Sequence, residues 1–276
     1  MTVETYHFNV GNFNGVAIND GYIGTISAAK FFDGASPGEL RAELGRYGLK
    51  PGKLRIPAII LYVDMGTQRV LIDTGGGPNA HPGCGLLMEG LRVEGIAPED
   101  VTIVALSHGH WDHVAGNLLA DGSLAFPNAR YVMARAEYDY WLSELAANPT
   151  SMVYRSLDAI RDHLDLIDPD AEIVPGFRAI AAPGHTFHHT AFAFESGGET
   201  LYCLIDTIDH PLHFEHIRWT PNWDDEPAQS VETRRTMFDR VSREGALLHG
   251  FHLPFPGLGQ LKVIETDSWQ LQPLGK

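Results

Sequence analysis

The sequence predicts an α/β fold with four layers, formed by a single domain over residues 1–276. Two observations carry this prediction. Short apolar runs, typical of buried strands, alternate with amphipathic runs of helical period, and glycines and prolines separate them. These runs form two successive groups of strands, each followed by helices, and no change in composition marks a linker between the groups.

The first group of strands lies between residues 58 and 106. Residues 58–63 and 69–73 are predicted to be strands joined by a turn, and the nearly all-apolar run 101–106 is typical of a buried strand. Three helices are expected to follow this group, over residues from about 113 to 119, 134–147 and 151–166.

The second group of strands is predicted at residues 172–174, 177–182, 190–195 and 200–205. Residues 227–244 are predicted to be a helix, because Pro227 is a start signal and an apolar stripe follows it. A last strand is expected at 245–249, just before His252.

Residues 33–57 are predicted to be an insertion that forms either a lid or a dimer contact, so a homodimer is one expectation. Within it, residues 34–38 match the G-x-S-x-G pattern of serine hydrolases. A nucleophile elbow needs a strand before the serine and a helix after it. Ser36, Pro37 and Glu39 instead predict a helix start with a capping box.

The composition limits the classes of partner. The net charge of −15 argues against nucleic acid and anionic membranes, because phosphate binding needs a basic surface. The N-terminal residues lack the pattern of a secretory signal, and no apolar run is long enough for a membrane helix. Only Cys84 and Cys203 occur, so no disulfide framework is expected. These features favour a cytoplasmic enzyme with a small-molecule substrate.

The segment 107–113, Ser-His-Gly-His-Trp-Asp-His, carries the densest group of metal-binding side chains and follows the strand 101–106. His108 and His110 are two residues apart in an extended loop, so both can converge on one ion. Asp112 and His113 lie where the loop turns into a helix, and can face a second ion. The alternative is that these are ordinary core or surface residues, but buried unpaired imidazoles and carboxylates are costly.

Three later segments complete the candidate site. His185 follows strand 177–182 and would complete the first ion's imidazole set, while His252 would serve the second ion. Asp206 ends strand 200–205 and could bridge both ions with its two oxygens. The predicted metal ligands are therefore His108, His110, Asp112, His113, His185, Asp206 and His252. Nitrogen and oxygen donors suit zinc, the default expectation, but also iron, manganese or cobalt.

These motifs resemble those of the metallo-β-lactamase-fold superfamily of metal-dependent hydrolases, over about residues 55–265. The resemblance implies an αββα sandwich with a dinuclear site at the edge of the sheets. It also implies that Asp73, at the end of strand 69–73, orients a metal-binding histidine without binding the metal. A strand-end helix cap is the alternative role for Asp73.

The C-terminal segment 250–259 and an aspartate at position 206 resemble the methyl parathion hydrolase-like and lactonase-like branch, which hydrolyses lactones, esters and phosphotriesters. The chain departs from the family pattern in three places. Phe187 and His188 replace a Pro-Gly turn before His189, which is expected to support the site rather than to bind metal. Ile205 replaces the usual glycine before the aspartate. Asp209 stands where acyl-homoserine lactonases tend to have a tyrosine.

Several aromatic residues are candidates for the walls of a substrate pocket: His210, Trp219, Trp223 and Phe255. The alternative is a packing role for the two tryptophans and Phe255, and a place in a solvated polar loop for His210. His213 and His216 follow His210 at intervals of three and have no assigned role.

The expected chemistry is hydrolysis by a hydroxide that bridges two cations, with Asp112 and Asp206 as the catalytic carboxylates. The expected substrate is a lactone, ester or phosphotriester. The alternatives are a thioesterase of the hydroxyacylglutathione type, a β-lactamase, a di-iron redox enzyme with the same fold, and a non-catalytic binding module.

Overall fold

The computed structural model describes residues 3–50, 52–78 and 80–275. Its strands form two sheets of seven strands each. The first sheet has the order β1-β2-β3-β4-β5-β6-β7. Its strands are β1 (Thr5–Val10), β2 (Phe13–Ile26), β3 (Leu54–Asp64), β4 (Arg69–Ile72), β5 (Ile103–Ala105), β6 (Arg130–Ala134) and β7 (Leu164–Ile167). The pairs from β1 to β4 are antiparallel, and those from β4 to β7 are parallel.

The second sheet has the order β14-β13-β12-β11-β10-β9-β8. Its strands are β8 (Glu172–Val174), β9 (Phe177–Ala181), β10 (Thr190–Ser196), β11 (Glu199–Cys203), β12 (Leu247–His249), β13 (Leu258–Glu265) and β14 (Ser268–Pro273). Only the pair β11–β12 is parallel among the named strands of this sheet.

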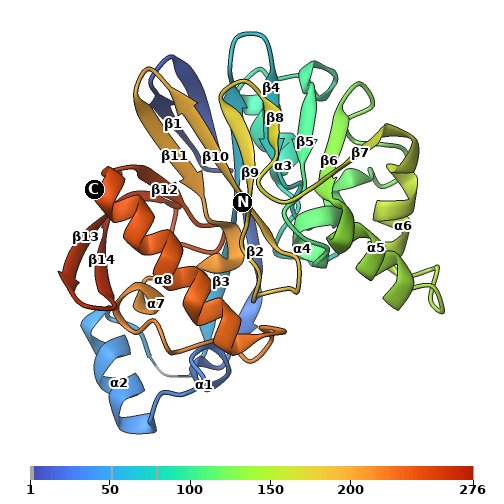
Figure 1. Cartoon of the computed structure of the whole chain (residues 1–276). Helices are drawn as coiled ribbons and strands as arrows, with labels where there is room; N and C mark the ends of the chain where they lie inside the picture. The colour runs from blue at the N-terminus through green and yellow to red at the C-terminus, as the bar shows by residue number, and fades with distance from the viewer. Residues whose placement is uncertain (1–2, 51, 79, 276) are drawn as a thin grey trace.

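Eight α-helices lie among the described residues. They are α1 (Ala28–Phe31), α2 (Pro37–Arg46), α3 (Leu87–Val93), α4 (Trp111–Val114), α5 (Arg135–Glu144), α6 (Met152–Ala159), α7 (Leu212–Glu215) and α8 (Pro227–Glu244). Short 3-10 helices are η1 (Pro98–Asp100), η2 (Ala115–Asn117), η3 (Arg161–His163) and η4 (Ile205–Thr207). Figure 1 shows α8 on one side of the molecule and α5 and α6 on the other, with the strands between them.

The alternation of side chains along β10 explains why the sheets stack. Phe192 and Phe194 lie in the cluster that also contains the first sheet's core residues, while Ala191 and Ala193 lie in the cluster that contains the apolar face of α8. Since successive strand residues face opposite sides, one strand contributes to two cores. The layers are therefore helix, sheet, sheet and helix, which confirms the predicted αββα sandwich.

The segment between β2 and β3 forms a third apolar cluster with α7, built around Phe31, Phe32 and Leu44. Within it, Ser36 accepts a hydrogen bond from Glu39 N, and the Glu39 side chain accepts one from Ser36 N. This is the predicted capping box at the start of α2, so Ser36 is a helix cap.

Two predicted helices were wrong in their extent. The one expected from about 113 to 119 is α4, over Trp111–Val114, followed by η2 over Ala115–Asn117. The helix expected over 151–166 ends at Ala159, and residues 164–167 form β7, which pairs in parallel with β6. Tertiary pairing decided this segment, because a short apolar run fits either a helix end or a strand. No helix in the part of the chain that the structure describes is long and apolar enough to cross a membrane.

Candidate metal centre

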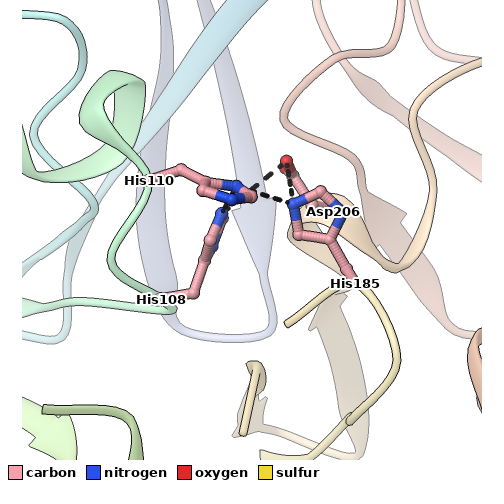
Figure 2. A group of neighbouring side chains, drawn as sticks. All are labelled: His108, His110, His185 and Asp206. Carbon is pink, nitrogen blue, oxygen red and sulfur yellow. Dashed lines mark hydrogen bonds and ion pairs between the residues drawn. The ribbon is translucent and has the colours of Figure 1, made fainter. Parts of the chain in front are cut away.

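Four loops bring the predicted ligands together at one edge of the two sheets. His108 and His110 follow β5, His185 follows β9, and Asp206 lies in η4 just after β11. The Nδ1 atom of His110 lies 2.9 Å from His108 Nε2 and 3.0 Å from His185 Nε2. Figure 2 shows these three imidazoles and the Asp206 carboxylate converging on one point. Ligand atoms of all four residues lie within 4.8 Å of one another.

A second group is formed by Asp112 and His113 from α4 and by His252, which follows β12. Asp112 Oδ2 lies 3.7 Å from His113 Nε2 and 3.5 Å from His252 Nε2. The side chains of Asp112 and His113 point to the site because α4 begins at Trp111, directly after the extended loop.

The Oδ2 atom of Asp206 lies between the two groups. It is 3.2 Å from His185 Nε2 in the first group and 3.2 Å from His252 Nε2 and 3.4 Å from His113 Nε2 in the second. The preceding residue, Ile205, has a φ of +52°, which turns the chain sharply after β11 and points the Asp206 carboxylate inward. A single carboxylate is thus placed to contact two ions at once.

Hydrogen bonds fix the orientation of four of the five histidines. In each, Nδ1 contacts an oxygen atom, which leaves Nε2 free to face the site. The partners are Ser107 Oγ for His108 (3.0 Å), Asp73 Oδ2 for His113 (2.8 Å), Asp224 Oδ1 for His185 (3.0 Å) and the Pro57 carbonyl for His252 (2.7 Å). His110 differs, because its Nδ1 atom is the one that faces the site.

The donor set fits divalent metal ions. His113 Nε2 and Asp206 Oδ1 are buried and have no hydrogen-bond partner among the described residues, which is costly unless a cation pairs with them. Burial and neighbouring imidazoles hold the pKa of His108 and of His110 well below the usual value, so both stay neutral. Neutral imidazole is the form that binds metal.

Asp73 lies directly after β4, is fully buried and contacts two of the segments that carry candidate ligands. Its Oδ1 accepts from Ser107 N and its Oδ2 from Ser107 Oγ, both at 2.8 Å. The same Oδ2 contacts His113 Nδ1. Asp73 therefore connects the loop that carries His108 to the imidazole of His113. Among the described residues, Asp73 makes no helix-capping contact.

A cavity of about 350 Å³ opens directly over the candidate ligands. Its lining includes His110, Asp112, His185, Asp206 and His252, together with Ile23, Gly24, Thr25, Ile26, Ile56, Trp111 and Trp223. The apolar walls thus come mainly from the end of β2, the start of β3 and α4. From the segment 33–57, which was predicted to be an insertion, Ile56 lines this wall.

Of the four predicted pocket residues, only Trp223 lines this cavity. His210 packs against Phe31 and Phe32 in the third apolar cluster. Trp219 stacks on His216 at 3.8 Å between ring centroids, and Phe255 packs against the main core. None of these three lines the cavity, because the first two pack against the segment between β2 and β3 instead.

Two further histidines near the site, His189 and His213, contact backbone carbonyl groups. His189 is buried with its Nδ1 3.2 Å from the Ala182 carbonyl, and its ring packs 5.1 Å from that of His108. It supports the His108 ring through packing, with no hydrogen bond to a candidate ligand. His213 Nε2 lies 3.3 Å from the Phe31 carbonyl, so His213 belongs to the third apolar cluster.

Sequence reasoning missed three buried polar residues around the site: Asp224, Arg234 and Glu137. Asp224 contacts His185, and Arg234 lies 3.5 Å from the other Asp224 oxygen. Glu137 accepts hydrogen bonds from two of the histidine loops. Each is a single charged residue in a helix or loop, with no local pattern to distinguish it from a solvent-exposed one.

Asp209 is also buried, and neither of its carboxylate oxygens has a hydrogen-bond partner among the described residues. One of them lies within 4.8 Å of ligand atoms of Asp206 and His252. Burial and the Asp206 carboxylate raise the pKa of Asp209 to about 7.

The comparisons with known proteins agree with this geometry. The family model of the metallo-beta-lactamase superfamily matches residues 54–212, more than half of the chain. The chain belongs to the metallo-beta-lactamase superfamily.

Within that superfamily, the chain is similar to a dizinc quorum-quenching lactonase in complex with a product, N-hexanoyl-L-homoserine. The two are 26% identical with a TM-score of 0.91, covering 99% of this chain and 98% of that one. A hydrolase of the beta-lactamase superfamily is 25% identical with a TM-score of 0.90, covering 100% of this chain and 99% of that one. A curated N-acyl homoserine lactonase from a Bacillus species is 31% identical over 119 residues, which is 43% of this chain and 42% of that relative. This chain thus matches about two fifths of that relative's length.

Proposed function

We propose that this chain is a metal-dependent hydrolase that opens lactones, with N-acyl homoserine lactones as the first class to test. The observation that carries the proposal is the position of Asp206 Oδ2 between two groups of imidazoles on the floor of a largely apolar cavity. Similarity to the dizinc lactonase over nearly the full chain supports the substrate class. Zinc is the metal that we expect, at two ions per chain.

The residues of the site have different roles in hydrolysis. When bound, two divalent cations would lower the pKa of a shared water toward neutrality and polarise the substrate carbonyl. Asp112 and Asp206 line the cavity, where one of the two carboxylates would take the proton of the attacking water and pass it to the leaving ring oxygen. The ring C–O bond then breaks, and the product is an acyclic hydroxy acid. The walls formed by Ile23, Ile26, Ile56, Trp111 and Trp223 exclude bulk water and suit an apolar acyl chain.

The test compares metal content and turnover in wild type, His110→Ala and His163→Ala. His163 is exposed in η3, away from the site, so its variant is the matched control. We expect two zinc ions per wild-type chain and lactone turnover. In His110→Ala we expect kcat/KM to fall by more than about 100-fold, since even residues that only support a metal ligand contribute about 10- to 100-fold. The control keeps both metal and activity.

Other outcomes would exclude parts of the proposal. Full activity of His110→Ala, or of chelator-treated protein, would rule out the metal mechanism. Turnover of thioesters, phosphotriesters, aryl esters or a chromogenic cephalosporin in preference to lactones would reject the substrate class. Iron with a visible absorption band, and no hydrolysis, would favour the redox alternative.

A further inference from the structure

Helix α5 places one buried carboxylate between two of the loops that carry candidate ligands. Glu137 is fully buried. Its Oε1 accepts a hydrogen bond from Gly109 N at 3.1 Å, and its Oε2 accepts one from Thr186 Oγ1 at 2.9 Å. Gly109 lies between His108 and His110, and Thr186 directly follows His185. A single side chain therefore connects a loop of the first sheet with a loop of the second.

Trp141, one helical turn after Glu137, contacts the same loop. Its Nε1 donates to Glu137 Oε1 at 2.6 Å, and its ring lies 5.5 Å from that of His110 at an angle of 75°. The indole packs so closely on Gly109 that a Cβ at that position would lie 2.3 Å from Trp141 Cδ1. The backbone between His108 and His110 is thus held between an indole face and a carboxylate.

The contacts of Glu137 indicate a structural role in the site without direct participation in the chemistry. Glu137 does not line the cavity over the ligands and belongs to neither group of candidate metal ligands among the described residues. All three of its hydrogen-bond partners are donors on protein groups. These bonds constrain the distance between the two loops, and hence the separation of 3.0 Å between His110 Nδ1 and His185 Nε2.

We propose that Glu137 is a positioning residue for one of the two ions, the one held by His108, His110 and His185. The proposal rests on the proposed function only in requiring that metal binds at this site. The second group has its own supports, Asp73 for His113 and the Pro57 carbonyl for His252, and these do not involve α5. Loss of the Glu137 contacts should therefore weaken one ion and leave the other in place.

The experiment measures zinc stoichiometry and affinity of the full-length protein by competition with a chromogenic chelator. The variants are Glu137→Leu, which removes both acceptor atoms at similar volume, and Glu137→Gln, which keeps one acceptor for Gly109 and Trp141 and offers an amide to Thr186. Glu144→Leu is the matched control, since Glu144 is exposed at the end of the same helix. We expect Glu137→Leu to weaken one of the two zinc ions by about 10- to 100-fold. We expect Glu137→Gln and Glu144→Leu to hold both ions as wild type does.

The melting temperature with and without zinc separates positioning from a general loss of stability. A positioning role reduces the increase in melting temperature that zinc produces, whereas a merely structural role lowers both melting temperatures equally. If Glu137→Leu does not fold, Thr186→Val removes one of the two loop contacts and should weaken the same ion to a smaller degree.

Three results would overturn the inference: two zinc ions held by Glu137→Leu with wild-type affinity, equal weakening of both ions, or a Glu137→Gln variant as impaired as Glu137→Leu. In the Thr186→Val experiment, unchanged affinity for both ions would do the same. If the wild-type protein binds no metal, the proposed function itself fails, and this result is distinct from all of these.

Discussion

The turn that carries Asp206 has a backbone conformation that β-branched residues rarely adopt. Ile205, directly before it, has a φ of +52° and is completely buried in the main core. A side chain with a Cβ in this left-handed region costs roughly 1–2 kcal/mol. The turn is nevertheless what points the Asp206 carboxylate at both groups of ligands, so the strain is tolerated where it positions the site.

The strain at Ile205 predicts an unusual order of stability for two variants. Both Ile205→Ala and Ile205→Gly lose about 2–4 kcal/mol through lost burial. Because glycine adopts a positive φ freely, we expect Ile205→Gly to be the more stable of the two by about 1 kcal/mol. The measurement is urea unfolding of metal-free protein.

Ile208 provides the control for this prediction, since it is equally buried but has a φ of −143°. There the ordinary order should hold, with Ile208→Ala more stable than Ile208→Gly. The same order at both positions would show that the positive φ at Ile205 stores no strain.

At the scale of the elements, β2 and the loop after β4 are joined by the buried carboxylate of Asp20. Its Oδ2 accepts from Gly76 N and Gly85 N, both at 3.1 Å, and its Oδ1 accepts from Leu87 N at 2.8 Å. The strand is irregular at this point, since its register with β3 shifts between Asn19 and Gly21. These bonds link the strand that ends at the cavity wall to the loop beside α3.

The Asp20 carboxylate predicts a pH dependence of stability. Burial raises its pKa to about 6, although the backbone N–H groups oppose the shift. Since the folded pKa lies above the unfolded value of about 3.9, the folded state binds more protons between pH 4 and 6, and stability from this group falls as the pH rises. The loss is on the order of 3 kcal/mol, because one pKa unit corresponds to about 1.36 kcal/mol.

The measurement compares wild type with Asp20→Asn in urea at pH 4.5, 5.5 and 7, with metal removed by a chelator. The stability of wild type relative to the variant should decrease as the pH rises across this range. A difference that stays constant with pH would contradict the assignment of this titration to Asp20.

The accuracy of the predicted elements depended on how local their signals were. Helix α8 spans residues 227–244 as predicted, because Pro227 marks its start and Gly245, with a φ of +62°, ends it. Strand β7 was missed, because its four residues are stable only through pairing with β6. The N-terminal strands β1 and β2 were likewise not predicted, since an antiparallel pair depends on contacts outside each strand.

At the scale of the whole molecule, the candidate ligands come from both sheets, with the loops after β5 on one side and those after β9, β11 and β12 on the other. Metal bound here would connect the two halves of the sandwich. A site built from both sheets exists only in the folded state. The free energy of metal binding therefore adds to the free energy of unfolding.

We therefore expect zinc to raise the melting temperature of the wild-type protein. At a free zinc concentration about 100 times the Kd, the gain in unfolding free energy is about 2.7 kcal/mol. His252→Ala, which removes a ligand from the second sheet, should lose much of this gain, whereas His163→Ala should retain it. Differential scanning fluorimetry with and without a chelator is the measurement, and an equal gain in His252→Ala and wild type would be evidence against a site shared by the two sheets.

The match to the family model confirms the superfamily predicted from the motifs. A homodimer, a cytoplasmic location and the single-domain organisation stay predictions, as do the roles of the seven side chains as metal ligands. For those side chains, the structure adds that their imidazole nitrogens and carboxylate oxygens lie together in two neighbouring groups.

By itself, the sequence determined the superfamily and the kind of chemistry, because histidines and aspartates at strand ends form short local motifs that need no knowledge of distant contacts. Only the tertiary structure decided which residues support and surround the site. Ile23, Ile56 and Trp111 at the cavity wall, and Glu137 and Asp224 behind the histidines, are far apart in the chain from most of the residues they serve. Their roles arise from packing between the two sheets and the helices. Burial and hydrogen bonds between residues that are distant in the chain leave no periodic pattern in the sequence.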